Sequence, residues 1–307
     1  MAATNDSYRA DEPDWQRGKQ RPRAFAPLNP NKQDPHQRQK LRGIIFDVDG
    51  TLCLPQNYMF KEMRAALNIS RSVDILDHIH DLSDVPDSTS SNAESQSSIN
   101  PSAPSEEVLS HSTLTPAPAP TSPRARAVAK IRNIERTAMT SQRPQPGLQQ
   151  LMAYLSSRGI PKALCTRNFP APVHHLLDKF LDGEVFEPII TRDSEGIAPK
   201  PSPEGLWSIA HAWGLDKDID ASGADLQQSG TVDVDPLNLA KRYLGSGLIM
   251  VGDSIDDMTA GRRAGAATVL LANDENEHLA EHECTDLSIR RLDELIDVLE
   301  KGFQARK

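Results

Sequence analysis

Two aspartates at the end of an apolar run, Asp47 and Asp49, have the residue types and spacing that most favour chemistry in this chain. The run from Ile44 to Phe46 is long enough for a buried strand, and Gly50 allows a sharp turn after the second aspartate. Two carboxylates this close could act as a nucleophile beside a general acid, bind a metal ion, or do both. The alternative is that their side chains only cap the turn that follows the strand.

The strand before Asp47 is one of several that are expected to alternate with helices. Hydrophobic periodicity predicts strands at 44–46, 162–165, 185–190, 248–251 and 268–271, and helices at 56–67, 71–82, 124–139, 148–158, 173–181, 204–213 and 292–299. Such alternation is typical of a parallel sheet with helices on both faces. We therefore expect an α/β fold with a doubly wound, Rossmann-like core.

Polar residues also follow the other predicted strands. Thr166, Arg167 and Asn168 come after 162–165, Lys200 lies in the loop after 185–190, and Asp253, Asp256 and Asp257 follow 248–251. Ligands of open parallel sheets bind at the carboxyl ends of the strands. We expect these side chains to meet Asp47 and Asp49 there.

Composition divides the chain into a core, a helical subdomain and polar segments. Residues 1–40 show no helical or strand period, which predicts a disordered tail. We assign 41–54 and 146–303 to the core, with an irregular insertion at 216–238, and 55–145 to the helical subdomain. Residues 83–123 within it hold 16 Ser or Thr and 7 Pro in 41 residues, which predicts a disordered insert.

Net charge and cysteine content argue against some classes of protein, namely nucleic-acid-binding and secreted proteins. The net charge is -9, and the eight basic and five acidic residues of 1–40 leave -12 on the remainder, which argues against nucleic-acid binding. The three cysteines have no paired spacing and indicate a reducing compartment. Neither a secretory signal nor a membrane span is expected. We expect a cytoplasmic protein without a membrane partner, and a nuclear location is not excluded.

The four polar positions resemble the motifs of the haloacid dehalogenase superfamily. Those motifs are D-x-D-G-T after the first strand, Ser or Thr after the second, a loop lysine, and G-D-x-x-x-D. The resemblance covers about 41–271 without the inserts, and it implies that 55–145 is a helical cap, as in the phosphoglycolate-phosphatase-like and phosphoglucomutase-like branch. It implies a Mg2+-dependent phosphatase acting on a small phosphorylated metabolite, because dehalogenases lack an acid at the position of Asp49.

The resemblance also implies a role for each site residue. Asp47 is implied to attack phosphorus and form an aspartyl-phosphate, and Asp49 to act as general acid and then general base. Thr166 and Lys200 are implied to hold phosphoryl oxygens, and Asp253 to complete the Mg2+ site with Asp47 and the backbone carbonyl of Asp49.

The roles of four further residues follow less directly. In the family that the chain resembles, the second acid of the last motif lies four residues after the first, so the resemblance implies that Asp257 orients Lys200 or a metal-bound water. Asp256 either helps or is an ordinary acid at a helix start. Arg167 and Asn168 either contact substrate or are solvated in their loop.

Alternative functions stay open at this point. One is a sugar-phosphate mutase of the same superfamily. Another is a non-catalytic regulatory or scaffold protein, whose Ser/Thr-Pro steps in 83–123 would be phosphorylated and recognised by a partner. The pattern H-x-x-E-H at 278–282 resembles an inverted zinc-peptidase motif, but no third ligand follows, so we interpret it as a solvated helix face.

Overall fold

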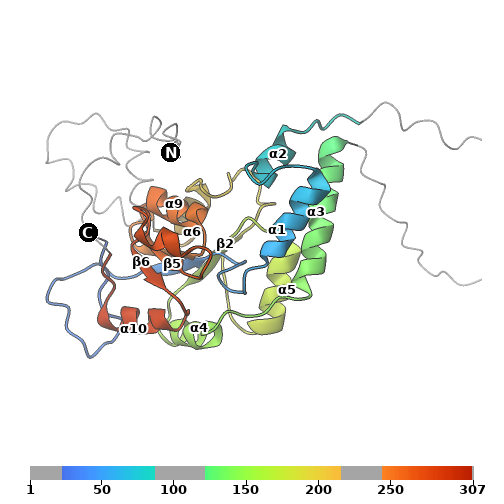
Figure 1. The fold of residues 1–307 in the computed structure, drawn as a ribbon. Coiled ribbons are helices and arrows are strands. Elements are labelled where there is room, and N and C mark those ends of the chain that lie inside the picture. The colour runs from blue at the N-terminus through green and yellow to red at the C-terminus, as the bar shows by residue number, and fades with distance from the viewer. Residues whose placement is uncertain (1–22, 87–121, 216–243, 306–307) are drawn as a thin grey trace, which may run out of the picture. The chain divides into compact units, whose positions relative to one another are not determined.

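The computed structural model describes residues 23–86, 122–215 and 244–305, which Figure 1 shows as a ribbon. The chain forms two compact units. One comprises Met1–Pro55 and Gln142–Lys307, and the other is Gln56–Ser141. The expected insertion at 216–238 and most of the expected insert at 83–123 lie outside the described residues.

A parallel sheet of six strands, as far as the chain is described, forms the centre of the first unit in the order β3-β2-β1-β4-β5-β6. The strands are β1 (Gly43–Phe46), β2 (Lys162–Cys165), β3 (Ile189–Ile190), β4 (Leu248–Gly252), β5 (Ala267–Leu271) and β6 (Leu287–Ile289). β1 pairs with β2 and β4, so Phe46 lies opposite Leu164 on one side and Val251 on the other. The residue after Phe46 therefore lies at the middle of the carboxyl edge.

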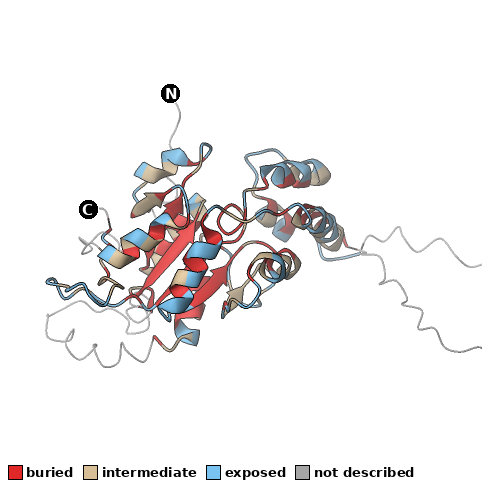
Figure 2. Ribbon diagram, turned by 90° about the horizontal axis from the view of Figure 1, so that it is seen from below, coloured by how far each residue is buried: buried red, intermediate tan, exposed pale blue. Residues whose placement is uncertain are grey.

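Helices cover both faces of this sheet because successive β1 side chains point to opposite sides. Ile44 and Phe46 belong to one core with residues of α4 (Leu148–Ser157), α5 (Pro170–Phe180) and α10 (Glu294–Lys301). Ile45 belongs to a second core with residues of α6 (Glu204–Ala212) and α9 (Ile255–Ala264). In Figure 2 the strands are buried and the flanking helices are buried on one side only. The expected doubly wound α/β fold is confirmed.

Residues 23–40 differ from the expected disordered tail. Phe25 is fully buried, its ring centroid lies 5.7 Å from that of Phe303, and its backbone N–H donates to the Phe303 carbonyl at 2.9 Å. The Ala305 N–H donates to the Arg23 carbonyl at 2.7 Å. The polar composition of this segment hid the apolar side chains that dock it, Phe25 and Leu28. The expectation for 1–22 lies outside the described residues.

The second unit is a small helical cluster. Its helices are α1 (Asn57–Leu67), α2 (Ile75–Asp81) and α3 (Pro123–Met139). Met59 and Met63 of α1 pack in one core with Ile79 and Ile131. The helix expected at 71–82 is wrong in its start, because the Asp74 side chain accepts from the N–H groups of Leu76 and Asp77 and so caps α2.

Other boundaries in the first unit also differ from the expected ones. The strand expected at 185–190 consists of 189–190 alone, since Val185 is exposed and Pro188 has no N–H to donate to a ladder. The helix expected at 173–181 begins at Pro170, a residue suited to a first helical turn. β6 was not expected, because three residues are too short for a periodic signal. Within the described ranges, the helices are all too short or too polar to span a bilayer.

Candidate active site

Sheet hydrogen bonds fix two of the expected site residues at the carboxyl edge. The Asp47 N–H donates to the Val251 carbonyl at 3.0 Å, and the Thr166 N–H donates to the Ile190 carbonyl at 2.9 Å. Asp47 therefore directly follows β1 and Thr166 directly follows the neighbouring β2. Both residues are buried although they are polar.

Lys200 joins two acids at this edge. It comes from the loop between β3 and α6, and its Nζ donates to Asp47 Oδ1 at 2.7 Å and to Asp257 Oδ1. Burial lowers the pKa of Lys200, but the negative charges of Asp257 and Asp47 outweigh that effect and hold the pKa above its ordinary value. Lys200 is therefore a buried ammonium ion at neutral pH.

The start of α9 fixes Asp257. The Ser254 hydroxyl donates to Asp257 Oδ2 at 2.6 Å, the Ser254 N–H donates to the same oxygen at 3.0 Å, and the Ser254 oxygen accepts from the Asp257 N–H. This reciprocal pattern is a capping box. It leaves Asp257 Oδ1 to bind Lys200, so Asp257 orients the lysine from the first turn of the helix.

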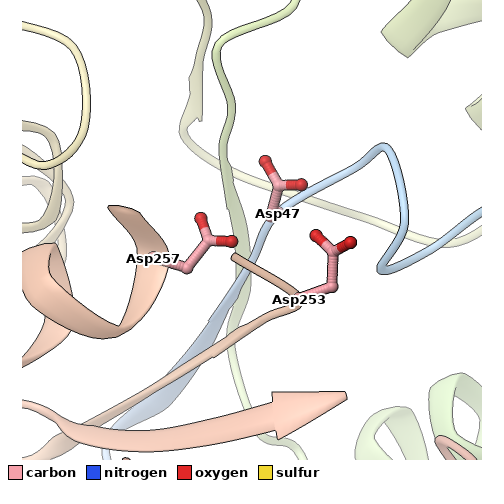
Figure 3. Close-up of side chains that lie close together, drawn as sticks. All are labelled: Asp47, Asp253 and Asp257. Atoms are coloured by element: carbon pink, nitrogen blue, oxygen red, sulfur yellow. The ribbon is translucent and has the colours of Figure 1, made fainter. Parts of the chain in front are cut away.

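Asp253 completes a cluster of three carboxylates. Asp47, Asp253 and Asp257 each offer an oxygen atom, and the three atoms lie within 4.8 Å of one another (Figure 3). Burial, together with the charges of Asp257, Asp47 and Asp49, raises the pKa of Asp253 to about 9. Burial also raises the pKa of Asp47, to about 6, although Lys200 opposes the shift. The cluster thus has three carboxyl groups beside one ammonium group, so Lys200 alone cannot balance their charge when all three are ionised.

Two glycines allow the acids to approach the backbone. A Cβ on Gly50 would lie 2.1 Å from Asp253 Oδ2, and a Cβ on Gly252 would lie 2.3 Å from the Asp257 Cβ. Gly50 also has a φ of +83°, which residues with side chains rarely adopt. The turn after Asp49 therefore needs glycine for both space and conformation.

The donor set fits a hard divalent cation. Mg2+ prefers oxygen ligands from one or two carboxylates and leaves room for water and phosphate. Asp47 and Asp253 supply such carboxylates, and an added positive charge would oppose both the burial and the neighbouring negative charges that raise the pKa of Asp253. The carboxylate of Asp49 is not one of this cluster of three, in agreement with the expectation that Asp49 would contribute its backbone carbonyl and not its side chain.

The residues after Thr166 take different positions. The Thr166 hydroxyl oxygen accepts from the Asn168 N–H at 3.2 Å, and Asn168 is buried. Arg167 forms an ion pair with Asp256, and both side chains are about 29% exposed. Asp256 and Asp257 thus separate clearly, since the first binds Arg167 and the second binds Lys200.

Two residues near the site were not recognised in the sequence. Ser254 could have been found, because serine three residues before an acid at a helix start is the capping-box spacing. Asn276 gave no signal: its Nδ2 donates to the Asp253 carbonyl at 2.7 Å and to the Leu271 carbonyl at 3.1 Å. His278 and His282 lie in and after a short 3₁₀ helix, Glu277–Glu281, outside the acid cluster.

Comparison with known proteins shows that the chain is similar to haloacid dehalogenase-like hydrolases. The family model described as haloacid dehalogenase-like hydrolase matches residues 41–265, and a HAD-hydrolase-like model matches 237–298. The uncharacterized hydrolase YOR131C of Saccharomyces cerevisiae is 34% identical over 265 residues, which cover 85% of this chain and 91% of that protein. A haloacid dehalogenase-like hydrolase domain-containing protein of Arabidopsis thaliana, At2g33255, is 25% identical over 76% of this chain and 72% of that protein.

Two solved structures share the fold at low sequence identity. One is a predicted phosphoglycolate phosphatase from Haemophilus somnus, with a TM-score of 0.50 and 16% identity over 84% of this chain and 97% of that one. The other is a putative phosphoglycolate phosphatase from Lactobacillus plantarum, with a TM-score of 0.50 and 12% identity over 84% and 99%.

Proposed function

The chain belongs to the haloacid dehalogenase-like hydrolases, and from that membership we propose that it is a Mg2+-dependent phosphatase acting on a small phosphomonoester. The observation that carries this proposal is the position of Asp47. Its carboxylate ends the central strand, one oxygen accepts from the buried Lys200 ammonium, and two further carboxylates lie within a few ångströms. A nucleophile, a cationic partner and a cation site are thus available at one point.

Asp47, Asp253 and the backbone carbonyl of Asp49 would hold the Mg2+ ion. When bound, the ion would offset the negative charge of the cluster and of the incoming phosphoryl group. Lys200 stays charged between Asp47 and Asp257, so it supplies a fixed positive charge next to the nucleophile. Preorganised charge of this kind stabilises a phosphoryl-transfer transition state without reorganisation.

The reaction we propose has two steps on the chain's own residues. In the first, an Asp47 oxygen forms a bond to phosphorus while the bond to the leaving oxygen breaks and Asp49 gives that oxygen a proton. In the second, Asp49 takes a proton from water, the water oxygen attacks phosphorus, and the bond to Asp47 breaks. The Thr166 hydroxyl and the Lys200 ammonium bind phosphoryl oxygens in both steps.

Hydrolysis of p-nitrophenyl phosphate by the purified chain tests the proposal. We expect turnover with Mg2+, loss of turnover in excess chelator, and recovery when Mg2+ is restored. Turnover that persists in chelator would contradict the metal requirement. A chain that releases no phosphate but exchanges phosphate between two sugar phosphates would instead be a mutase.

A further inference from the structure

Residues 52–54 and 143–145 form a short antiparallel ribbon beside the loop that carries Asp49. The Leu54 N–H donates to the Arg143 carbonyl at 2.8 Å, and the Gln145 N–H donates to the Leu52 carbonyl at 3.0 Å. Cys53 and Pro144 lie opposite each other in an antiparallel β-bridge. These backbone bonds hold the ribbon without help from the Gln145 side chain.

The Gln145 side chain makes a separate contact. Its Nε2 donates to the Gly50 carbonyl at 2.7 Å. Gly50 directly follows Asp49, and its Cα lies so close to Asp253 that no side chain fits between them. Gln145 therefore holds the Gly50–Thr51 peptide, one residue after the proposed general acid, and Gly50 itself lies against a proposed metal ligand.

We propose that Gln145 is a positioning residue for the first chemical step, a proposal that rests on the proposed role of Asp49. Its amide fixes the Gly50 carbonyl, and thereby the turn that directly follows Asp49 and sets where the Asp49 carboxyl lies relative to the leaving oxygen. Displacements of about 1 Å at a reacting group cost about 10²-fold in rate. A single hydrogen bond at this point can therefore affect proton transfer more than stability.

The same segment offers a matched control in Gln142. It lies three residues earlier and is also a glutamine, but its Nε2 donates to the Pro172 carbonyl of α5 at 3.4 Å. Replacing Gln142 by Leu removes an amide from the same segment without touching the Asp49 loop. Replacing Gln145 by Leu removes the amide that binds Gly50.

The experiment compares kcat/KM for two esters, p-nitrophenyl phosphate and a simple alkyl phosphate. p-Nitrophenolate leaves as a stable anion, whereas an alkoxide needs the proton from Asp49. We expect Gln145→Leu to lower kcat/KM for the alkyl ester by about 10- to 100-fold and to change the aryl value much less. We expect Gln142→Leu to change the ratio of the two values very little. Asp49→Asn should show the same preference for the aryl ester, and adding Gln145→Leu to it should cause little further loss.

Gln145→Glu provides a second variant of nearly the same shape. Its carboxylate cannot donate to the Gly50 carbonyl at neutral pH, whereas the protonated form can. Its deficit on the alkyl ester should therefore shrink as the pH falls, relative to wild type at each pH. This variant also serves if Gln145→Leu does not fold.

Three results would overturn the inference: equal losses on both esters, no loss on either, or additive effects of Gln145→Leu and Asp49→Asn. Equal losses with a lower melting temperature would mean that Gln145 is only structural. If wild type hydrolyses neither ester, the proposed function itself fails, and this outcome is distinct from the other three.

Discussion

Two buried groups of acids and bases in the first unit differ in their ratio of charges. At the carboxyl edge, Asp47 and Asp257 share the single cation Lys200, and Asp253 lies beside them. Near β6, the single carboxylate of Asp286 accepts from Arg23 at 3.1 Å, from Arg262 at 2.9 Å and from the Thr268 N–H at 3.0 Å.

The difference between the two groups explains why one is a candidate site and the other is structural. Asp286 is almost fully buried, but two guanidinium groups and a backbone donor satisfy it, so it has no charge left for a ligand. The acids at the edge outnumber their cation, and burial together with this excess of negative charge raises the pKa of Asp253. A buried acid thus indicates binding or catalysis when its partners are too few.

The largest effect is expected from the nucleophile. Asp47→Asn should lower turnover of p-nitrophenyl phosphate by at least about 10⁴-fold, as loss of a nucleophile does in other enzymes. The melting temperature should not fall, because burial already disfavours the charged form of Asp47. Beryllium fluoride with Mg2+ should raise the melting temperature of wild type and not of Asp47→Asn. Equal shifts in both proteins would place the reactive carboxylate elsewhere.

The next effect concerns the proposed general acid. Asp49→Asn should retain the fold and lower turnover by about 10²- to 10⁴-fold, the range for loss of general acid–base catalysis. Steady-state kinetics on an alkyl phosphate measure this loss. A wild-type rate in this variant would remove Asp49 from the mechanism.

Mutation of Asp286, the acid near β6, should lower the stability of the protein and leave its catalytic rate unchanged. Asp286→Ala leaves the buried Arg23 guanidinium without its charged partner, so unfolding free energy should fall by about 3–5 kcal/mol. Thermal melts measure the fall, at about 2–4 °C per kcal/mol for a chain of this size. Below the melting temperature, kcat/KM should match wild type, and a selective loss of activity in the folded variant would break the comparison.

The smallest effect should have the opposite sign. The pKa of Asp253 rises from 3.8 to about 9 on folding without metal, so the folded state binds this proton more tightly than the unfolded state. The protonated Asp253 therefore contributes fully to the free energy of unfolding below pH 3.8, and this contribution is lost as the pH rises towards about 9. In chelator, Asp253→Asn should therefore melt about 2–4 °C above wild type at neutral pH, a gain of about 1 kcal/mol.

The pH series supplies the control for that prediction. The difference in melting temperature between Asp253→Asn and wild type should grow from pH 5 to pH 8 in chelator and shrink when Mg2+ is added. A difference in melting temperature that does not vary with pH would mean that folding does not raise the pKa of Asp253.

Short-range patterns carried most of what the sequence could predict. The apolar run before Asp47 and the alternation of strands and helices sufficed for the fold, because burial of both sheet faces leaves a strong local signal. The positions of Asp47, Thr166 and Asp253 followed from the rule that parallel strands end at one edge.

What the sequence could not provide depends on contacts between distant segments. Nothing local to Asn276 or Gln145 indicates that their amides bind the carbonyls of Asp253 and Gly50. Phe25 looked like part of a polar tail, because its burial requires Phe303 at the other end of the chain. Such contacts follow from the three-dimensional path of the backbone and leave no periodic trace.

The pairing of Phe25 with Phe303 also has a consequence for vectorial synthesis on the ribosome. Residues 23–28 are made long before their backbone partners, which include Leu299, Phe303 and Ala305. Phe25 therefore cannot pair with Phe303 until synthesis has passed residue 303. Docking of this segment therefore follows synthesis of residues 299–305, and a nascent chain that stops before Leu299 would leave Phe25 without these contacts.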